Sequence, residues 1–279
     1  MNYGKVAFIG GGNMARALAG GMYVAGYNPS NILIADPLIE TRDRLANEFP
    51  GTIIRADNLD VAKQAECLVL AVKPQILSMV CKSLKDVVQI TKPLIISIAA
   101  GVRSSDIDLW LGGGLSVVRT MPNQPALLGL GVSGMYANEQ TSKKELHIAN
   151  CIIKTSGPVI SVSNESDIDS VTAISGSGPA YFYLLIDMLA TIAKDMGLDP
   201  KAALDLAIET ARGASEIAKQ SDETMETLIS HVRSPGGTTA AALDYLDNSN
   251  FRDIFTAAVT AARDRAKGLA DQVHEEAKD

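Results

Sequence analysis

Three glycines near the start of the chain separate an apolar run from an amphipathic segment. The run Val6–Ile9 ends in Gly10-Gly-Gly12, and small Ala15 follows three positions later. In such a turn the first glycine permits a sharp exit from a strand, and the next lets the backbone approach a pyrophosphate. A small residue at Ala15 lets the following helix pack close to the sheet, with its N-terminal N–H groups facing the anion. We therefore expect a dinucleotide here, with a glycine-rich turn that holds no ligand as the alternative.

An acidic residue follows the second apolar run. Ile32–Ala35 ends in Asp36, which lies 26 positions after Gly10, close to the spacing at which a carboxylate meets the adenosine ribose. A carboxylate accepts hydrogen bonds from free ribose hydroxyls and repels a 2′-phosphate, which favours NAD(H). Arg42 and Arg44 follow within two helical turns, and either could neutralise such a phosphate if its side chain folds back.

Small residues, prolines and polar side chains follow three later apolar runs. In a doubly wound sheet the ligand lies beyond the carboxyl ends of the strands, so these positions are candidates for contact with the cofactor. Small residues let a flat ring lie against backbone, and the Asn123 amide offers both a donor and an acceptor. An ordinary surface role for Lys73 and a packing role for the Ala99-Ala-Gly101 turn remain alternatives. The candidates are Ala71, Val72, Lys73, Pro74, Ala99, Ala100, Gly101 and Asn123.

A second glycine-rich stretch, Ser234-Pro-Gly-Gly-Thr-Thr239, lies in the last third of the chain. It is typical of an exposed helix N-terminus, with Ser234 as a capping side chain and glycine N–H groups that can face an anion. A small carboxylate is the natural ligand for such a terminus. A plain turn between two helices is the alternative.

The order of the apolar patterns predicts an α/β fold. Up to about Ser161, near-continuous apolar runs alternate with helical segments, which indicates a parallel sheet covered by helices on both faces. We therefore predict a Rossmann-type doubly wound sheet over residues 1–163. The expected strands are Val6–Ile9, Ile32–Ala35, Thr52–Ile54, Leu68–Val72, Leu94–Ile98, Val117–Arg119, Val132–Tyr136 and Val159–Val162.

Residues 164–279 show only helical patterns and predict an all-helical second domain. The segment from Tyr181 to Ile192 is apolar on most sides, so more than one neighbour must bury it. A partner subunit and a central place in its own bundle both satisfy that requirement. The expected helices are Ile168–Met196, Pro200–Lys219, Thr224–Val232, Thr239–Leu246 and Phe251–Ala277.

Composition argues against several classes of partner. The formal net charge is −7 without a basic cluster, which argues against nucleic acid. No window reaches the ~20 apolar residues that span a bilayer, and we expect a soluble cytoplasmic protein. The three cysteines lie far apart, so neither a disulfide framework nor a zinc site is expected. His147, His231 and His274 lack ligand spacing, and we expect no metal site.

Six motifs together resemble the pyrroline-5-carboxylate reductase family, in that family's order and over nearly the whole chain. The resemblance implies reduction of L-1-pyrroline-5-carboxylate to L-proline, the last step of proline synthesis. It also implies a Rossmann domain, a helical domain for dimerisation and substrate binding, and a homodimer that assembles further, such as into a decamer. The motifs are Phe8-Ile-Gly-Gly-Gly-Asn-Met14, Ala71-Val-Lys-Pro74, Ser97-Ile-Ala-Ala-Gly101, Arg119-Thr-Met-Pro-Asn123, Ile174-Ser-Gly-Ser-Gly-Pro-Ala-Tyr181 and Ser234-Pro-Gly-Gly-Thr-Thr239.

The resemblance also assigns residues by position. Gly10, Gly12, Asn13 and Met14 would hold the pyrophosphate, and Asn58, Ala71, Lys73, Pro74, Ala99 and Ala100 would line the cofactor. Ser234, Gly237, Thr238 and Thr239 would hold the substrate, with Thr239 in the catalytic role. The family implies NADP(H), whereas Asp36 favours NAD(H), so use of both is expected.

Two positions depart from the family's usual pattern. Gln124 stands where the family carries threonine, so the family's hydrogen bonding at this position does not carry over to this chain. Asp36-Pro37 stands where many members carry a neutral residue followed by Arg or Ser to hold a 2′-phosphate.

Other functions fit parts of the pattern. A 3-hydroxyacid dehydrogenase of similar layout needs a lysine base on its interdomain helix, but this chain has no lysine between Lys154 and Lys194. Glu165, Asp167 and Asp169, at the start of that helix, are interpreted as partners of the helix dipole rather than as bases. Another imine-reducing oxidoreductase of the same layout is a further alternative. A dinucleotide-binding scaffold without activity would have no need for a helix terminus suited to a carboxylate, such as the Ser234–Thr239 turn.

Overall fold

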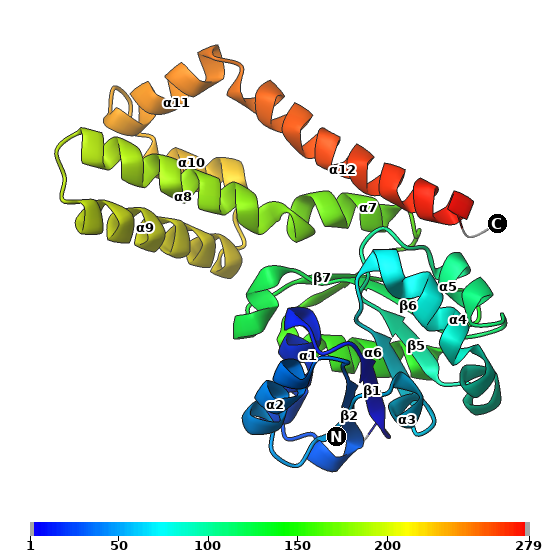
Figure 1. The fold of residues 1–279 in the computed structure, drawn as a ribbon. Coiled ribbons are helices and arrows are strands. Elements are labelled where there is room, and N and C mark those ends of the chain that lie inside the picture. The colour runs from blue at the N-terminus through cyan, green and yellow to red at the C-terminus, as the bar shows by residue number, and fades with distance from the viewer. Residues whose placement is uncertain (1–2, 277–279) are drawn as a thin grey trace. The chain divides into compact units, whose positions relative to one another are not determined.

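Eight strands form one sheet in the order β3-β2-β1-β4-β5-β6-β7-β8 in the computed structural model, which describes residues 3–276 (Figure 1). The strands β1 to β6 are parallel and have the order of a dinucleotide-binding sheet, which confirms the Rossmann-type prediction. Their bounds are β1 Val6–Ile9, β2 Ile32–Ala35, β3 Ile53–Arg55, β4 Cys67–Leu70, β5 Leu94–Ser97 and β6 Val117–Met121.

The last two strands differ from the predicted parallel arrangement. β7 (Ser133–Ala137) runs antiparallel to β6, and β8 (Val159–Ser161) runs parallel to β7. A parallel crossover needs a dozen or more residues, usually with an α-helix. The connection from β6 to β7 holds only the short 3-10 helix η2 (Gln124–Leu128), so an antiparallel return is the arrangement it allows.

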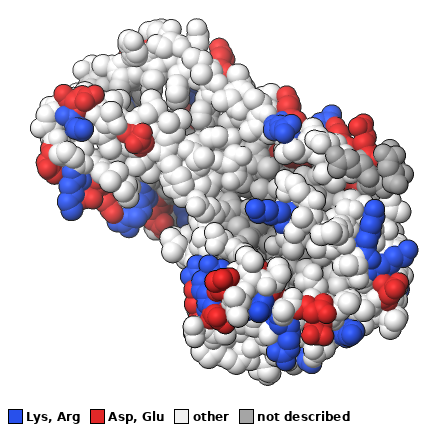
Figure 2. Space-filling view, in the orientation of Figure 1, with Lys and Arg blue, Asp and Glu red and all other residues white. Residues whose placement is uncertain are grey.

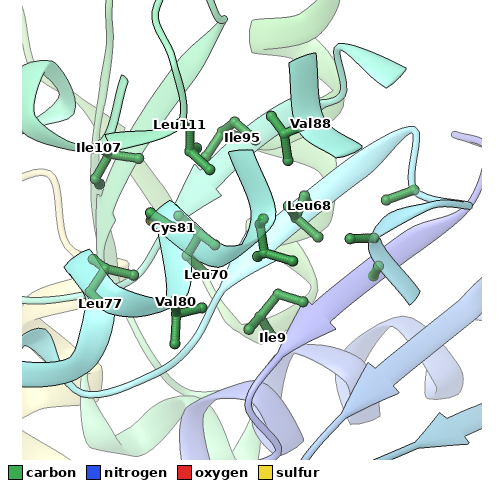
Figure 3. Close-up of a cluster of buried hydrophobic side chains, with 14 of the residues drawn as sticks. Ile9, Leu68, Leu70, Leu77, Val80, Cys81, Val88, Ile95, Ile107 and Leu111 are labelled. Carbon is green, nitrogen blue, oxygen red and sulfur yellow. The ribbon is translucent and has the colours of Figure 1, made fainter. Parts of the chain in front are cut away.

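Helices cover both faces of the sheet. Along β1, Ala7 and Ile9 face one buried cluster, whereas Val6 and Phe8 face the other. Figure 3 shows part of the first cluster, where Leu77 and Val80 lie over the sheet. The first cluster is closed by α3 (Asn58–Ala62), α4 (Pro74–Thr91) and α5 (Ser104–Trp110), and the second by α1 (Asn13–Val24), α2 (Ile39–Glu48) and α6 (Lys143–Ile153).

The register of the strands places the last residues of β1, β2, β4 and β5 side by side, and the candidate site residues come directly after them. Ile9 at the end of β1 pairs with Ala35 of β2 and with Leu70 of β4. Leu70 in turn pairs with Ser97 of β5. The residues that come next in each strand therefore lie at the same carboxyl edge, as the fold class requires.

The chain divides into two compact units, and the division differs from the predicted boundary after residue 163. The first unit runs to Gly176 and includes the chain from Ala262 on, whereas the second is Ser177–Ala261. α7 (Asp167–Val171) belongs to the first unit because Ile168 and the carboxylates of Glu165 and Asp169 pack against the sheet region.

The C-terminal part of α12 (Phe251–Glu276) also belongs to the first unit. Ala266 and Ala270 are buried there, and Asp271 and His274 pair with Arg103 and Asp106 beside α5. Sequence pattern alone shows one continuous helix, so this return to the sheet was not predictable from periodicity.

The second unit consists of helices only. Its helices are α8 (Gly178–Asp195), α9 (Pro200–Gln220), α10 (Met225–Val232), α11 (Thr238–Asn248) and the first part of α12. The expected continuous helix Ile168–Met196 is instead interrupted by a π-helical turn, η4 (Thr172–Gly176). Small residues and glycine in Ile174-Ser-Gly-Ser-Gly weaken the regular α pattern, so that the break falls on this motif.

Few residues of the second unit are buried within the chain. In Ser177–Ala261, all of which the structure describes, only Gly178, Ala203 and Ala207 are buried. Phe182 of α8 is 59% exposed and Leu189 is 52% exposed. On the face shown in Figure 2, charged side chains gather at the outer end and along the lower edge of the helical unit, and the surface above them is largely uncharged. α8 is therefore not the buried centre of its own bundle, which removes one of the two arrangements considered from the sequence.

Candidate functional site

The glycine turn between β1 and α1 has the geometry that a pyrophosphate needs. Gly10 has a φ of +98°, and a Cβ there would lie 2.7 Å from the Ala71 carbonyl oxygen, so a side chain is excluded. At Gly12, by contrast, a Cβ would meet nothing within 4 Å. Gly12 is the N-cap of α1, and no side chain in the described part of the chain caps this helix. The N–H groups around Asn13 and Met14 are thus available to an anion.

Asp36 lies beside this turn, as its spacing predicted. Its Oδ2 accepts a hydrogen bond from the Gly11 N–H at 2.8 Å, and its Oδ1 accepts one from the Leu38 N–H at 2.9 Å. The carboxylate therefore ties the β1–α1 turn to the turn after β2. An ionised carboxylate has about four acceptor positions, so both oxygens keep capacity for a further donor such as a ribose hydroxyl.

Arg42 and Arg44 also lie beside the turn. Arg42 Nη1 donates to the carbonyl oxygens of Asp36 and Pro37 at 2.9 and 2.8 Å. Arg44 Nη2 lies 3.5 Å from the Gly11 carbonyl oxygen. Two guanidinium groups thus place positive charge close to Asp36, where a 2′-phosphate would need it.

The loops after β4 and β5 bring the other cofactor candidates to the same edge. Lys73 is exposed and is the N-cap of α4, which starts at Pro74, so it is held at the edge by the helix start. Gly101 has a φ of +69° and is buried. Ala71 and Val72 are half-buried, Ala99 is buried and Ala100 is exposed. Asn58 follows β3 instead, at the start of α3, and is half-buried.

Asn123, after β6, is engaged within the protein. Its Nδ2 donates to the Ser175 carbonyl oxygen at 3.1 Å, and its Oδ1 accepts from the Val132 N–H at 2.9 Å. The amide therefore fixes the loop after β6 to the π-helical turn. The Ile174–Tyr181 motif, which had no role assigned from the sequence, thus contributes the carbonyl group that holds Asn123. Contact between Asn123 and the cofactor stays a prediction.

The sequence did not predict a network of charged side chains around the buried Arg119 of β6. Glu165 accepts hydrogen bonds from Ser104 N at 2.6 Å and from Ser104 Oγ at 2.8 Å. Arg119 Nη1 lies 3.4 Å from Glu165 Oε1, and Arg119 Nη2 lies 3.6 Å from Asp169 Oδ1. Burial raises the pKa of Asp169, and the Arg119 guanidinium opposes that rise.

The interpretation of Glu165 and Asp169 as partners of the helix dipole alone was therefore incomplete. Glu165 precedes α7, which begins at Asp167, and its carboxylate holds the residue that starts α5. The available signal was the arginine within the apolar strand Val117–Met121, because a buried guanidinium requires acidic partners.

The substrate candidates lie together in the second unit, around the start of α11. The N-cap is Gly237 rather than Ser234, and no side chain in the described part of the chain caps the helix. The Ser234 carbonyl oxygen accepts a hydrogen bond from the Gly237 N–H at 2.9 Å, with Pro235 and Gly236 between them. Gly236 has a φ of +70°, as the third position of a type II turn requires.

The capping role predicted for Ser234 was therefore wrong, because a tight turn separates it from the helix. The uncapped terminus itself remains: the N–H groups of the first turn, at Thr238 and Thr239, are available to a carboxylate. Thr238 is exposed and Thr239 is half-buried.

Within residues 3–276, no group of three or more His, Cys, Asp or Glu side chains has a geometry that could hold a metal ion. None of the helices described is both long and apolar enough to cross a membrane.

Comparison with known proteins shows which family shares this arrangement. A curated pyrroline-5-carboxylate reductase from Pseudomonas aeruginosa is 38% identical over 273 residues, which cover 98% of this chain and 99% of that protein. This chain belongs to the pyrroline-5-carboxylate reductase family. Residues 165–269 match the model of the family's dimerisation domain, and residues 5–101 match the model described as NADP oxidoreductase coenzyme F420-dependent.

Solved structures of the family agree with this fold. A pyrroline-5-carboxylate reductase from Coxiella burnetii is 39% identical with a TM-score of 0.92, and the match covers 96% of this chain and 99% of that one. The Plasmodium falciparum pyrroline carboxylate reductase with NADP bound is 30% identical with a TM-score of 0.85, covering 97% and 99% of the two chains.

Proposed function

We propose that this chain reduces L-1-pyrroline-5-carboxylate to L-proline with a nicotinamide cofactor, as the last step of proline biosynthesis. The observation that carries the proposal is the match over 98% of the chain to the Pseudomonas aeruginosa reductase. Both the glycine turn after β1 and the uncapped start of α11 support it, because the reaction needs one anion site for the cofactor and one for the substrate carboxylate.

The residues present fit a dinucleotide. The open space at Gly12 and the uncapped N-terminus of α1 suit a pyrophosphate, and Asp36 and the two arginines lie where the adenosine ribose would be read. Gly10, Gly12, Asn13 and Met14 would hold the pyrophosphate. The rest of the cofactor would be lined by Asn58, Ala71, Val72, Lys73, Pro74, Ala99, Ala100, Gly101 and Asn123.

The reaction depends more on the orientation of the substrate imine relative to the nicotinamide than on acid–base catalysis. The bound nicotinamide would supply a hydride to the imine carbon of the substrate. The first turn of α11 binds the substrate carboxylate through its N–H groups, with Ser234, Gly237 and Thr238 shaping that site. The Thr239 hydroxyl donates a hydrogen bond to the lone pair of the ring nitrogen, which becomes more basic as hydride reaches the adjacent carbon, and so helps that nitrogen to gain its proton. No strong general base is needed.

The same reasoning disfavours a 3-hydroxyacid dehydrogenase. That reaction must remove a hydroxyl proton, and the acidic residues near the start of α7 are already engaged. Glu165 holds Ser104 and Arg119, and Asp169 faces Arg119. These carboxylates are ion-pair partners rather than free bases.

NADPH is the principal cofactor in this proposal, and NADH is also used. Arg42 and Arg44 supply charge for a 2′-phosphate, and the family comparison with an NADP-bound structure supports the same choice. Asp36 retains acceptor positions for free ribose hydroxyls, which supports NADH. A surface ion pair is worth only about 1 kcal/mol, so discrimination between the two stays modest.

The working form is a homodimer, built through the exposed apolar face of α8, that assembles into a larger ring such as a decamer. The small number of buried residues in Ser177–Ala261 supports the dimer, because an isolated unit of this kind lacks a core. A cytoplasmic location, with neither nucleic acid nor membrane as a partner, completes the proposal.

The test is a spectrophotometric assay with the purified protein. Addition of L-1-pyrroline-5-carboxylate to enzyme and NADPH lowers the near-ultraviolet absorbance of the reduced cofactor, whereas 3-hydroxy acids with NADP⁺ give no increase. The reverse pattern would contradict the proposal and favour the dehydrogenase.

A further inference from the structure

A charged cavity lies within the first unit, apart from the residues assigned to cofactor and substrate. Its volume is about 350 Å³. It is formed by the loop before α5, by β6, by the start of α7 and by the part of α12 that returns to the sheet. Four cationic side chains, Arg103, Arg119, Arg263 and Lys267, and two acidic ones, Glu165 and Asp169, line it.

Most of these charges already have partners. Glu165 receives Ser104 and Arg119, and Arg103 pairs with Asp271. Asp169 faces Arg119 at 3.6 Å, a distance too long for a hydrogen bond.

Two cationic groups keep unused donors. The Arg119 side chain is only 3% exposed, yet its Nε and Nη2 lack hydrogen-bond partners among the described residues. Lys267 makes neither a hydrogen bond nor an ion pair within residues 3–276 that would occupy its ammonium group. Arg263 also lines the cavity and is paired with the adjacent Asp264 at 2.8 Å.

These observations identify the kind of ligand that would fit. Buried donors without partners, such as those of Arg119, are unfavourable, and an acceptor with negative charge satisfies them best; the exposed Lys267 adds a positive charge beside them. The volume lies at the lower end of the range for small-molecule sites, roughly 300–1,000 Å³, so the ligand must be small. Asp271 and Asp264 balance Arg103 and Arg263, so Lys267 and the unused Arg119 donors are the groups left for a ligand.

We propose that this cavity binds a small anion bearing a carboxylate or phosphate group, held between Arg119 and Lys267. The ligand would lie next to Glu165, which fixes Ser104 three residues after Gly101 in the cofactor loop. Binding there is independent of the proposed reaction, since no residue of the cavity belongs to the substrate or cofactor set.

The test uses thermal unfolding of the full-length protein with saturating NADP⁺, which keeps added phosphate away from the glycine turn. Inorganic phosphate and succinate are titrated separately, at constant ionic strength maintained with chloride. We compare the wild type with the double variant Arg263→Ala/Lys267→Ala and with Arg265→Ala. Arg265 lies on the same helix but outside the cavity, so its variant is the matched control.

The expected result is a saturable rise in Tm for the wild type and for Arg265→Ala. The double variant should need about tenfold more anion for half of the rise, because two charge-assisted contacts are lost. The anion that saturates at the lower concentration shows whether phosphate or carboxylate is preferred. A rise that is equal in all three proteins, or one that does not saturate, would overturn the proposed site.

Discussion

At the scale of single residues, the site depends on backbone donors that no side chain uses. Gly12 at the start of α1 and Gly237 at the start of α11 both leave the first turn of a helix uncapped. A helix end without a cap loses stability, typically about 1 kcal/mol. At these two starts an anion is expected to take up the free N–H groups, and the glycine turns that precede the helices are what made the stretches recognisable from sequence.

The role of Thr239 predicts that substitutions at two adjacent residues affect different kinetic constants, kcat at Thr239 and KM at Thr238. Thr239→Ala should lower kcat by about tenfold with little change in KM, because its hydrogen bond to the ring nitrogen strengthens in the transition state. Thr238→Ala should mainly raise KM, because the carboxylate is bound equally before and during the reaction. Steady-state kinetics with pyrroline-5-carboxylate as the varied substrate measure both.

Thr239→Ser is the control for this prediction, since it keeps the hydroxyl and should retain most of the wild-type kcat. An unchanged kcat for a well-folded Thr239→Ala protein would remove Thr239 from the catalytic role.

At the scale of elements, the sequence predicted the strands and the glycine turn but not the connections between distant segments. The run before Gly10 and the run before Asp36 were identifiable because buried parallel strands are apolar on both faces. The antiparallel β7, the π-helical turn and the return of α12 were not, because each depends on tertiary contacts that periodicity does not record. The pairing of Arg119 with Glu165 likewise joins positions 46 residues apart.

The contact between Asp36 and the glycine turn predicts the cofactor preference. Asp36→Ser removes a negative charge beside the ribose, so the ratio of kcat/KM for NADPH to that for NADH should rise, by about tenfold. The wild-type ratio should itself lie within about a hundredfold, because the Asp36 carboxylate disfavours a 2′-phosphate while Arg42 and Arg44 favour it. Asp36→Asn keeps an acceptor for the Gly11 N–H without the charge, and should shift the ratio in the same direction.

A ratio that stays constant in both variants would mean that Asp36 serves only to hold the Gly11 turn. The placement of the adenosine ribose beside β2 would then be wrong.

At the scale of the whole molecule, the two units differ in how much apolar surface each buries within one chain. The sheet unit has two continuous buried clusters, whereas the helical unit Ser177–Ala261 buries almost nothing within one chain. Hydrophobic burial is the main favourable term in folding, so the helical unit must obtain it from a partner. The match of residues 165–269 to the family's dimerisation domain agrees with this requirement.

Introducing a charge into the exposed apolar face of α8 tests this requirement. Leu185 is 38% exposed in the single chain, and Leu185→Asp should dissociate or unfold the dimer because the carboxylate would be buried without a partner. Ile90 on α4 is 83% exposed, and Ile90→Asp should leave the assembly unchanged. Size-exclusion chromatography with light scattering measures both, and a folded wild-type monomer at micromolar concentration would contradict the dimer.

The central claim, hydride transfer to the imine of pyrroline-5-carboxylate, is tested most directly by isotope transfer. The purified protein is incubated with L-1-pyrroline-5-carboxylate and NADPH deuterated at C4, using each of the two C4 diastereomers separately, and the product is analysed by mass spectrometry. One diastereomer should give L-proline with a single deuterium on the ring carbon next to nitrogen that does not carry the carboxylate, and the other should give unlabelled proline. Oxidation of NADPH without labelled proline from either diastereomer, or no oxidation at all, would contradict the claim.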